Sequence, residues 1–131
     1  MVDEVEIFVC VACEPRREGA VGARSGTWLA QSVHDRLAKL GATGITVRKV
    51  ECLAVCKRPS TIALTAPGKW TYVIGDLDPG THVADIVATA MAFQRSDAGI
   101  VPWADRPAPF RRGVIARVPP LGFEQPAAET A

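Results

Sequence analysis

Four cysteines in two short-spaced pairs are the residues of this chain best suited to chemistry. Two residues separate Cys10 from Cys13, three separate Cys52 from Cys56, and thirty-eight lie between the pairs. Each pair can chelate from one backbone turn, while the long separation lets the fold set the angle between the pairs. The spacing indicates a set of four thiolate ligands.

Three kinds of site use cysteines in such a pattern. Structural zinc is held by four thiolates, but the pairs of a zinc ribbon lie about 15 to 20 residues apart, and such sites mainly serve chains that lack a core. A catalytic dithiol of the thioredoxin type would use Cys10 and Cys13. An iron-sulfur cluster normally takes four cysteines. The plainest alternative is that the four cysteines form no site and are buried as small hydrophobic side chains.

The cysteine pairs follow two predicted strands that flank a predicted helix. Val5–Cys10 alternates apolar and polar residues and then becomes wholly apolar, and Ile45–Val50 alternates. Both are rich in β-branched side chains, which is typical of strands. Thr27–Leu40 repeats leucine and valine at helical spacing, with Ser25 as a plausible N-cap and Gly41 just beyond the end. Both cysteine pairs are therefore expected at strand ends, where a site is favoured over burial in the core.

The segment 14–26 is expected to be a loop, because it carries Pro15, three glycines and three arginines without periodicity. This loop separates Cys13 from the following helix, whereas a thioredoxin-type dithiol lies on the first turn of one. A dithiol function would also leave the second cysteine pair, Cys52 and Cys56, without a role. Dithiol exchange is therefore less favoured than a cluster.

A hairpin and a second helix are predicted after the second pair. Thr61–Leu64 and Trp70–Ile74 read as strands joined by a type II turn at Pro67-Gly68. Asp78-Pro79 would cap a helix that runs to about Gln94. The predicted class is α/β, with the order strand, helix, strand, strand, strand, helix.

The composition changes at Asp97, and six of the ten prolines fall after it. We expect a tail without regular elements, laid across the domain by its aromatic residues and disordered from about Glu124. A partner-docking arm is the alternative. The predicted division is residues 1–96 as the cysteine domain and 97–131 as its extension.

Composition excludes several classes of protein. The 131 residues are 48% hydrophobic, and 15 Lys and Arg balance 14 Asp and Glu to a net charge of +1. This length can bury a core without disulfides, and the pI of about 7.7 argues against nucleic acid. With neither a spanning segment nor a signal peptide in the sequence, we expect a cytoplasmic protein with reduced cysteines.

The second half of the chain resembles the thioredoxin-like [2Fe-2S] ferredoxins, which include the dimeric Shethna-type ferredoxins and a subunit of respiratory NADH dehydrogenase. The residues that carry the resemblance are Glu51-Cys52-Leu53-Ala54-Val55-Cys56-Lys57-Arg58-Pro59, Thr61–Leu64, Trp70-Thr71-Tyr72 and Asp76-Leu77-Asp78-Pro79-Gly80. The resemblance covers roughly Val5 to Gln94 of this chain. The resemblance implies a thioredoxin-like fold in a ferredoxin variant.

The first pair departs from that pattern, because only Val11 and Ala12 separate its cysteines where those ferredoxins have a longer spacer. The tight pair and the arginine- and proline-rich tail are similar to a family of small bacterial proteins described as predicted metal-binding, some encoded near cobalamin-biosynthesis or metal-chaperone genes. Zinc therefore stays an alternative cofactor.

The resemblance implies that Cys10 and Cys13 hold one iron and that Cys52 and Cys56 hold the other. It further implies an electron carrier with no substrate site, hence no enzyme, working with a redox partner protein and forming a homodimer away from the cluster. A role in cobalt or corrin metabolism would follow from the second family. A zinc or metal-handling protein and a thiol-disulfide oxidoreductase are the alternatives.

Histidines and tryptophans complete the candidate residues. His34 and His82 lie outside local ligand spacing of any cysteine, and we expect both at the surface. Trp28, Trp70 and Trp103 could shape a partner surface, although packing in the core or its rim is the commoner role of an aromatic side chain.

Overall fold

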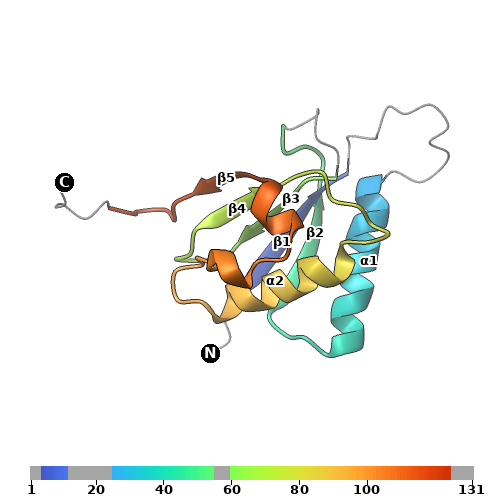
Figure 1. The fold of residues 1–131 in the computed structure, drawn as a ribbon, viewed down its shortest axis with the longest axis horizontal. Helices are drawn as coiled ribbons and strands as arrows, with labels where there is room; N and C mark the ends of the chain where they lie inside the picture. Colours follow the sequence, from blue (N-terminus) through green and yellow to red (C-terminus); the bar gives the residue numbers. More distant parts are fainter. Residues whose placement is uncertain (1–3, 12–24, 55–59, 125–131) are drawn as a thin grey trace.

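A five-stranded mixed sheet with helices against one face forms the framework (Figure 1). The computed structural model describes residues 4–11, 25–54 and 60–124. In space the strands follow the order β2-β1-β3-β4-β5, with β1 parallel to β2 and the other neighbours antiparallel. The strands are β1 (Val5–Cys10), β2 (Ile45–Val50), β3 (Ile62–Thr65), β4 (Thr71–Ile74) and β5 (Val114–Val118).

Two long helices connect and follow these strands. They are α1 (Ser25–Leu40) and α2 (Val83–Arg95), and a short 3-10 turn η1 (Trp103–Asp105) and the one-turn helix α3 (Pro109–Arg112) come later. No helix within the described segments is long and apolar enough to cross a membrane. The predicted α/β class and its order of elements up to α2 are confirmed.

The core lies between the sheet and the two helices. Val5, Ile7 and Val9 of β1 are fully buried, whereas Glu6 and Phe8 between them are partly exposed on the other face, as the period of two requires. The helices supply the opposing layer with side chains at helical spacing. The helix residues that are buried there include Leu29, Val33 and Leu37 of α1 and Ile86, Val87, Ala90 and Phe93 of α2.

Helix α1 ends in a Schellman motif, as its glycine predicts. Gly41 has φ +67°, its N–H donates to the Ala38 carbonyl at 3.1 Å, and the Ala42 N–H donates to the Leu37 carbonyl at 3.1 Å. The start differs from the prediction, because Ser25 is the first helical residue rather than the cap before it.

The second helix begins later than the sequence predicts. Asp78 starts a separate turn, in which its carbonyl accepts the His82 N–H at 2.9 Å and its carboxylate accepts the Thr81 hydroxyl at 2.8 Å. Chiefly that hydroxyl, with the Gly80 N–H and His82, holds the pKa of Asp78 below its ordinary value of 3.8. Asp78 therefore caps this turn, and α2 starts at Val83.

The hairpin between β3 and β4 confirms the predicted turn. Gly68 has φ +73°, and the Lys69 N–H donates to the Ala66 carbonyl at 3.1 Å. Lys69 itself is buried, and its ammonium donates to the carbonyls of Phe93 and Gln94 at 2.9 and 2.6 Å. The turn is thereby fastened to the negative end of α2.

The segment after Asp97 is more regular than predicted, which corrects the expectation of a tail without elements. It contains η1, α3 and the edge strand β5, whose residues pair antiparallel with β4. Phe110 of α3 is buried. The Tyr72 hydroxyl accepts the Val101 N–H at 3.2 Å. Composition concealed these elements because pairing with β4, rather than local propensity, specifies the strand. The division at residue 97 stays a prediction, and the expected disorder after Glu124 lies outside the described residues.

Candidate functional site

Cys10 and Cys52 come to the same edge of the sheet. Cys10 is the last residue of β1 and pairs in parallel register with Val50, the last residue of β2, so that Cys52 follows just beyond the neighbouring strand end. The Cys10 thiol donates to the carbonyl of Glu51 at 3.8 Å. Cys13 and Cys56, the other two predicted ligands, lie outside the described residues.

The Cys52 sulfur is exposed and accepts a backbone hydrogen bond. The donor is the Ala54 N–H, at 3.1 Å from Sγ. Ala54 has φ +62°, a left-handed conformation that costs an alanine about 1 to 2 kcal/mol. Hydrogen bonds to ligating sulfurs are one of the means by which a protein tunes a thiolate-bound group. The left-handed turn at Ala54 therefore places such a donor on Cys52.

Cys10 is held rigidly by backbone bonds on both sides. Its N–H donates to the Thr61 carbonyl at 3.0 Å, and the Val11 N–H donates to the Val50 carbonyl at 2.9 Å. Only 3% of the Cys10 surface is exposed. The structure therefore fixes the position from which this sulfur could act.

The first turn of α1 lies against the backbone of Cys10. A Cβ at Gly26 would collide with the Cys10 carbonyl oxygen and lie 2.9 Å from the Val11 Cα. The amino end of a helix carries a partial positive charge that favours anions within its first turn. The fold thus brings this end beside Cys10, although the loop 14–26 separates the two in sequence.

Two backbone hydrogen bonds bring further segments of the chain to this edge of the sheet. Ser60 is buried with φ +59°, and its carbonyl accepts the Leu77 N–H at 3.2 Å. The next bond, from the Gly75 N–H to the Gly113 carbonyl at 3.0 Å, joins the end of β4 to the end of α3. The carboxyl ends of β1, β2 and β4 therefore share one edge with the start of α1 and the end of α3.

The chemistry of the described donors fits a thiolate-bound group. Two thiol groups lie at or just beyond the ends of neighbouring parallel strands, and the N–H···S bond and the helix amino end at this edge favour negative charge there. Within residues 4–11, 25–54 and 60–124, no cluster of three or more His, Cys, Asp or Glu side chains is arranged to hold a metal ion. The basic residues near the cysteines in sequence, Arg16, Arg17, Lys57 and Arg58, lie outside the described segments.

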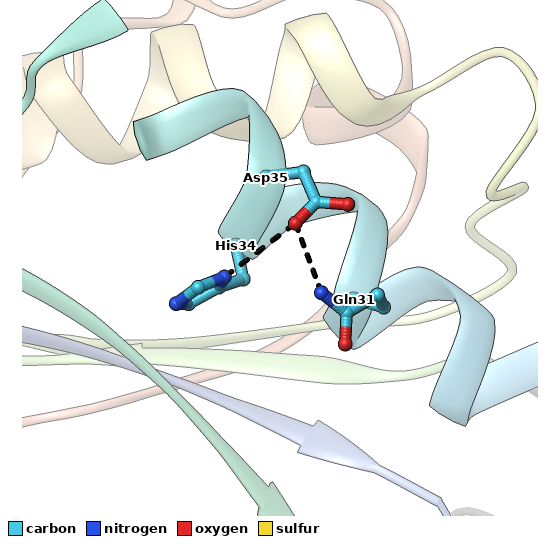
Figure 2. A network of polar contacts seen from close by, with 3 residues as sticks. All are labelled: Gln31, His34 and Asp35. Carbon is cyan, nitrogen blue, oxygen red and sulfur yellow. Dashed lines mark hydrogen bonds and ion pairs between the residues drawn. The ribbon is translucent and has the colours of Figure 1, made fainter. Parts of the chain in front are cut away.

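Among the described residues, the two histidines belong to no group arranged to hold a metal ion. His34 is exposed on α1, with Nδ1 3.6 Å from the Asp35 carboxylate, which also accepts the Gln31 amide at 2.9 Å (Figure 2). His82 is half-buried, and its Nδ1 accepts the Asp78 N–H at 2.9 Å. The predicted surface position is confirmed for His34.

Sequence reasoning missed two residues that shape the site. Gly26 was assigned to an irregular loop. Its position just after Ser25, the N-cap candidate, could have placed it in the first turn of α1. Ala54 gave no signal, because alanine is not a residue that predicts a left-handed turn. Both act through the backbone.

The fold is similar to solved structures of an iron-sulfur protein. The thioredoxin-like [2Fe-2S] ferredoxin from Aquifex aeolicus matches with a TM-score of 0.58 and 17% identity over 93% of this chain and 99% of that one. A 1.5 Å structure of the wild-type ferredoxin from the same organism gives 0.53 and 19%, covering 87% and 98%. At this identity the likeness establishes the fold alone.

Sequence comparison places the chain in a family. No curated protein is significantly similar to it in sequence. A family profile described as a protein of unknown function, DUF1636, matches residues 7–120. That range includes all four cysteines, α1, α2, the added elements η1, α3 and β5, and the sheet except for the first two residues of β1. The chain therefore belongs to the DUF1636 family of proteins of unknown function.

Proposed function

We propose that this protein is an electron carrier that binds one [2Fe-2S] cluster through Cys10, Cys13, Cys52 and Cys56. The observation that carries the proposal is the convergence of Cys10 and Cys52 on one sheet edge, next to the amino end of α1. Solved structures with a similar fold include thioredoxin-like [2Fe-2S] ferredoxins.

In the proposed assignment each cysteine pair holds one iron, Cys10 with Cys13 and Cys52 with Cys56. A bound cluster supplies a one-electron redox couple. The Ala54 N–H donates to the Cys52 sulfur, and the amino end of α1 lies beside the Cys10 backbone. Both would raise the reduction potential, because the reduced state carries one more negative charge. The chain's own contribution is to position the thiolates and set that charge balance.

The proposal includes the setting of the electron carrier. We propose that the protein is not an enzyme, that it exchanges electrons with a partner protein in the cytoplasm, and that it forms a homodimer away from the cluster. A link to cobalt or corrin metabolism belongs to the same proposal. Sedimentation of the purified protein tests the dimer, which predicts about twice the chain mass of 14.0 kDa.

One observation favours dithiol exchange as a second candidate. The amino end of α1 lies against Cys10, and a helix amino end lowers the pKa of a nearby thiol in thiol-disulfide oxidoreductases. That function would need only Cys10 and Cys13. Zinc held by all four cysteines is the remaining alternative.

Anaerobic purification followed by a visible spectrum and assays of iron, sulfide and zinc separates these functions. Red-brown protein with two irons and two sulfides per chain is the expected result. Colourless protein with one zinc would contradict it. Metal-free protein that reduces a disulfide substrate, and loses that activity when Cys10 or Cys13 is replaced, would instead establish the oxidoreductase.

Replacing single ligands tests the assignment itself. Cys10→Ser and Cys52→Ser are each expected to lose iron or to shift the visible bands, because both remove a thiolate. Ala38→Ser introduces the same hydroxyl at an exposed position of α1 and is expected to leave iron content and spectrum unchanged. An unaltered spectrum in Cys52→Ser would show that the second pair does not bind the cluster.

A further inference from the structure

Arginines surround an exposed tryptophan in the segment that follows α2. We call Trp103, Arg106, Arg111 and Arg112 the arginine patch. Trp103 is 60% exposed, and the guanidinium carbons of Arg106 and Arg111 lie 5.5 and 5.8 Å from its ring centroid. Arg111 and Arg112 are exposed. The patch therefore offers an aromatic surface bracketed by positive charge.

Three of the four residues of the arginine patch, Trp103, Arg106 and Arg111, are held in place before any partner arrives. Trp103 begins η1, and its carbonyl accepts the Arg111 Nε–H at 3.2 Å. Arg106 donates to the Val101 carbonyl at 2.8 Å and to the Tyr72 hydroxyl at 3.2 Å. Side chains that are already ordered lose less conformational entropy on association, and Trp and Arg dominate the energetics of protein interfaces. These are the properties of a docking surface rather than of solvated arginines.

The charge of this segment is one-sided. Between residues 103 and 118 four arginines face a single carboxylate, Asp105. The ion pairs found in the described part of the chain, His34 with Asp35 and Arg48 with Glu6, involve none of these arginines. Their charge is therefore left for an external partner, and the complementary partner surface is acidic.

The arginine patch ends at the edge of the sheet that carries Cys10. Arg112 precedes Gly113, whose carbonyl is bonded to the N–H of Gly75 at the end of β4. Both β1 and β4 run antiparallel to β3, so Gly75 and Cys10 lie at the same edge, two strand spacings apart. Two spacings amount to about 10 Å.

A carboxylate at the same edge gives the surface a direction. Asp78 lies three residues after Gly75 and is exposed. An acidic partner is attracted by the arginines and repelled by this aspartate, and such a contrast in charge fixes the orientation of an encounter. We propose that the arginine patch docks an acidic redox protein beside the cluster edge. The proposal rests on the proposed electron-carrier function.

The first experiment measures docking without using the cluster. Poly-L-glutamate and an acidic copolymer of glutamate and tyrosine serve as probes of the protein as purified, in low salt. Arg111→Gln/Arg112→Gln is expected to weaken binding of both probes about tenfold, since each exposed charge contact contributes up to about 1 kcal/mol. Trp103→Ala is expected to weaken binding of the copolymer more than that of poly-L-glutamate.

A matched double variant separates docking from net charge. Arg36→Gln/Lys39→Gln removes the same two charges from exposed positions of α1. It is expected to leave both affinities within about twofold of the unmodified protein, because these charges lie far along the helix from the cluster edge. The proposal would be overturned if both double variants lost affinity for the acidic probes equally, or if no form of the protein bound either probe.

The second experiment measures electron transfer from the reduced protein. One electron passes from the cluster to anionic ferricyanide or to cationic hexaammineruthenium(III), each of which is reduced by one electron. Arg111→Gln/Arg112→Gln is expected to slow the first reaction severalfold and not the second, and high salt should abolish the difference. A difference of the same size in Arg36→Gln/Lys39→Gln would contradict the proposal. Colourless protein with arginine-dependent probe binding would remove the electron-carrier function and leave acidic docking in place.

Discussion

Gly26 of helix α1 lies so close to Cys10 that no side chain fits between them. The contact joins the amino end of the helix to the strand end that carries the first cysteine. It requires glycine because the nearest atoms are backbone atoms of Cys10 and Val11, which cannot rotate away. The close approach of α1 to the backbone at the end of β1 therefore depends on this one position.

Gly26→Ala is expected to destabilise the protein by about 2 kcal/mol, since overpacking against backbone costs roughly 1 to 3 kcal/mol. It should also lower the iron content, because α1 must move away from Cys10. Chemical denaturation and metal analysis measure the two effects. Gly80→Ala is the control, since a Cβ there meets only the Asp78 carboxylate at an ordinary 3.5 Å. Equal stability of both variants would refute the close contact.

Ala54→Gly is expected to raise the free energy of unfolding by about 0.5 to 1 kcal/mol. Glycine removes the cost of φ +62°, about 1 to 2 kcal/mol, and loses part of that gain through the greater freedom of its unfolded chain. The Ala54 N–H that bonds to Cys52 is retained, so cofactor content should not change. Ala63→Gly in β3 should instead destabilise, because its backbone is extended. Denaturation curves of the two variants should therefore shift in opposite directions.

Lys69→Met is expected to cost about 2 kcal/mol, because it removes a charged donor from two carbonyls at the end of α2. The loss should appear as a lower denaturation midpoint with an unchanged slope. Lys39→Met, in the exposed last turn of α1, is the matched control and should stay within about 0.5 kcal/mol. A similar midpoint for both variants would show that the buried ammonium does not hold the hairpin to α2.

The lowered pKa of Asp78 predicts acid sensitivity in the turn before α2. A carboxyl whose pKa is lower in the folded state stabilises the protein above its unfolded pKa. That stabilisation is lost as the pH falls from the ordinary value of 3.8 through the lower folded value. Asp78→Asn should therefore make stability fall less steeply in this acid range. Asp85→Asn serves as the control. Parallel pH profiles for Asp78→Asn and the unmodified protein would contradict the role of the Thr81 hydroxyl.

Local pattern was sufficient for the elements that hold the described cysteines. Alternation defined β1 and β2 with the bounds that the structure has, and the leucine spacing and Gly41 defined the end of α1. These features depend on residues close in sequence, where strand period, helix period and capping act directly. The sequence alone also singled out the cysteines as the candidate ligands.

The start of α2 was missed for a local reason, because side-chain bonds among Asp78, Thr81 and His82 compete with the helix. Tertiary structure decided the rest. The strand β5 was missed because its partner β4 is distant in sequence. Only folding brings Cys52 and the start of α1 to the same edge as Cys10, since parallel pairing and close backbone packing are contacts between segments that no local pattern encodes. The sequence determined which residues could do chemistry, and the sheet decided where they meet.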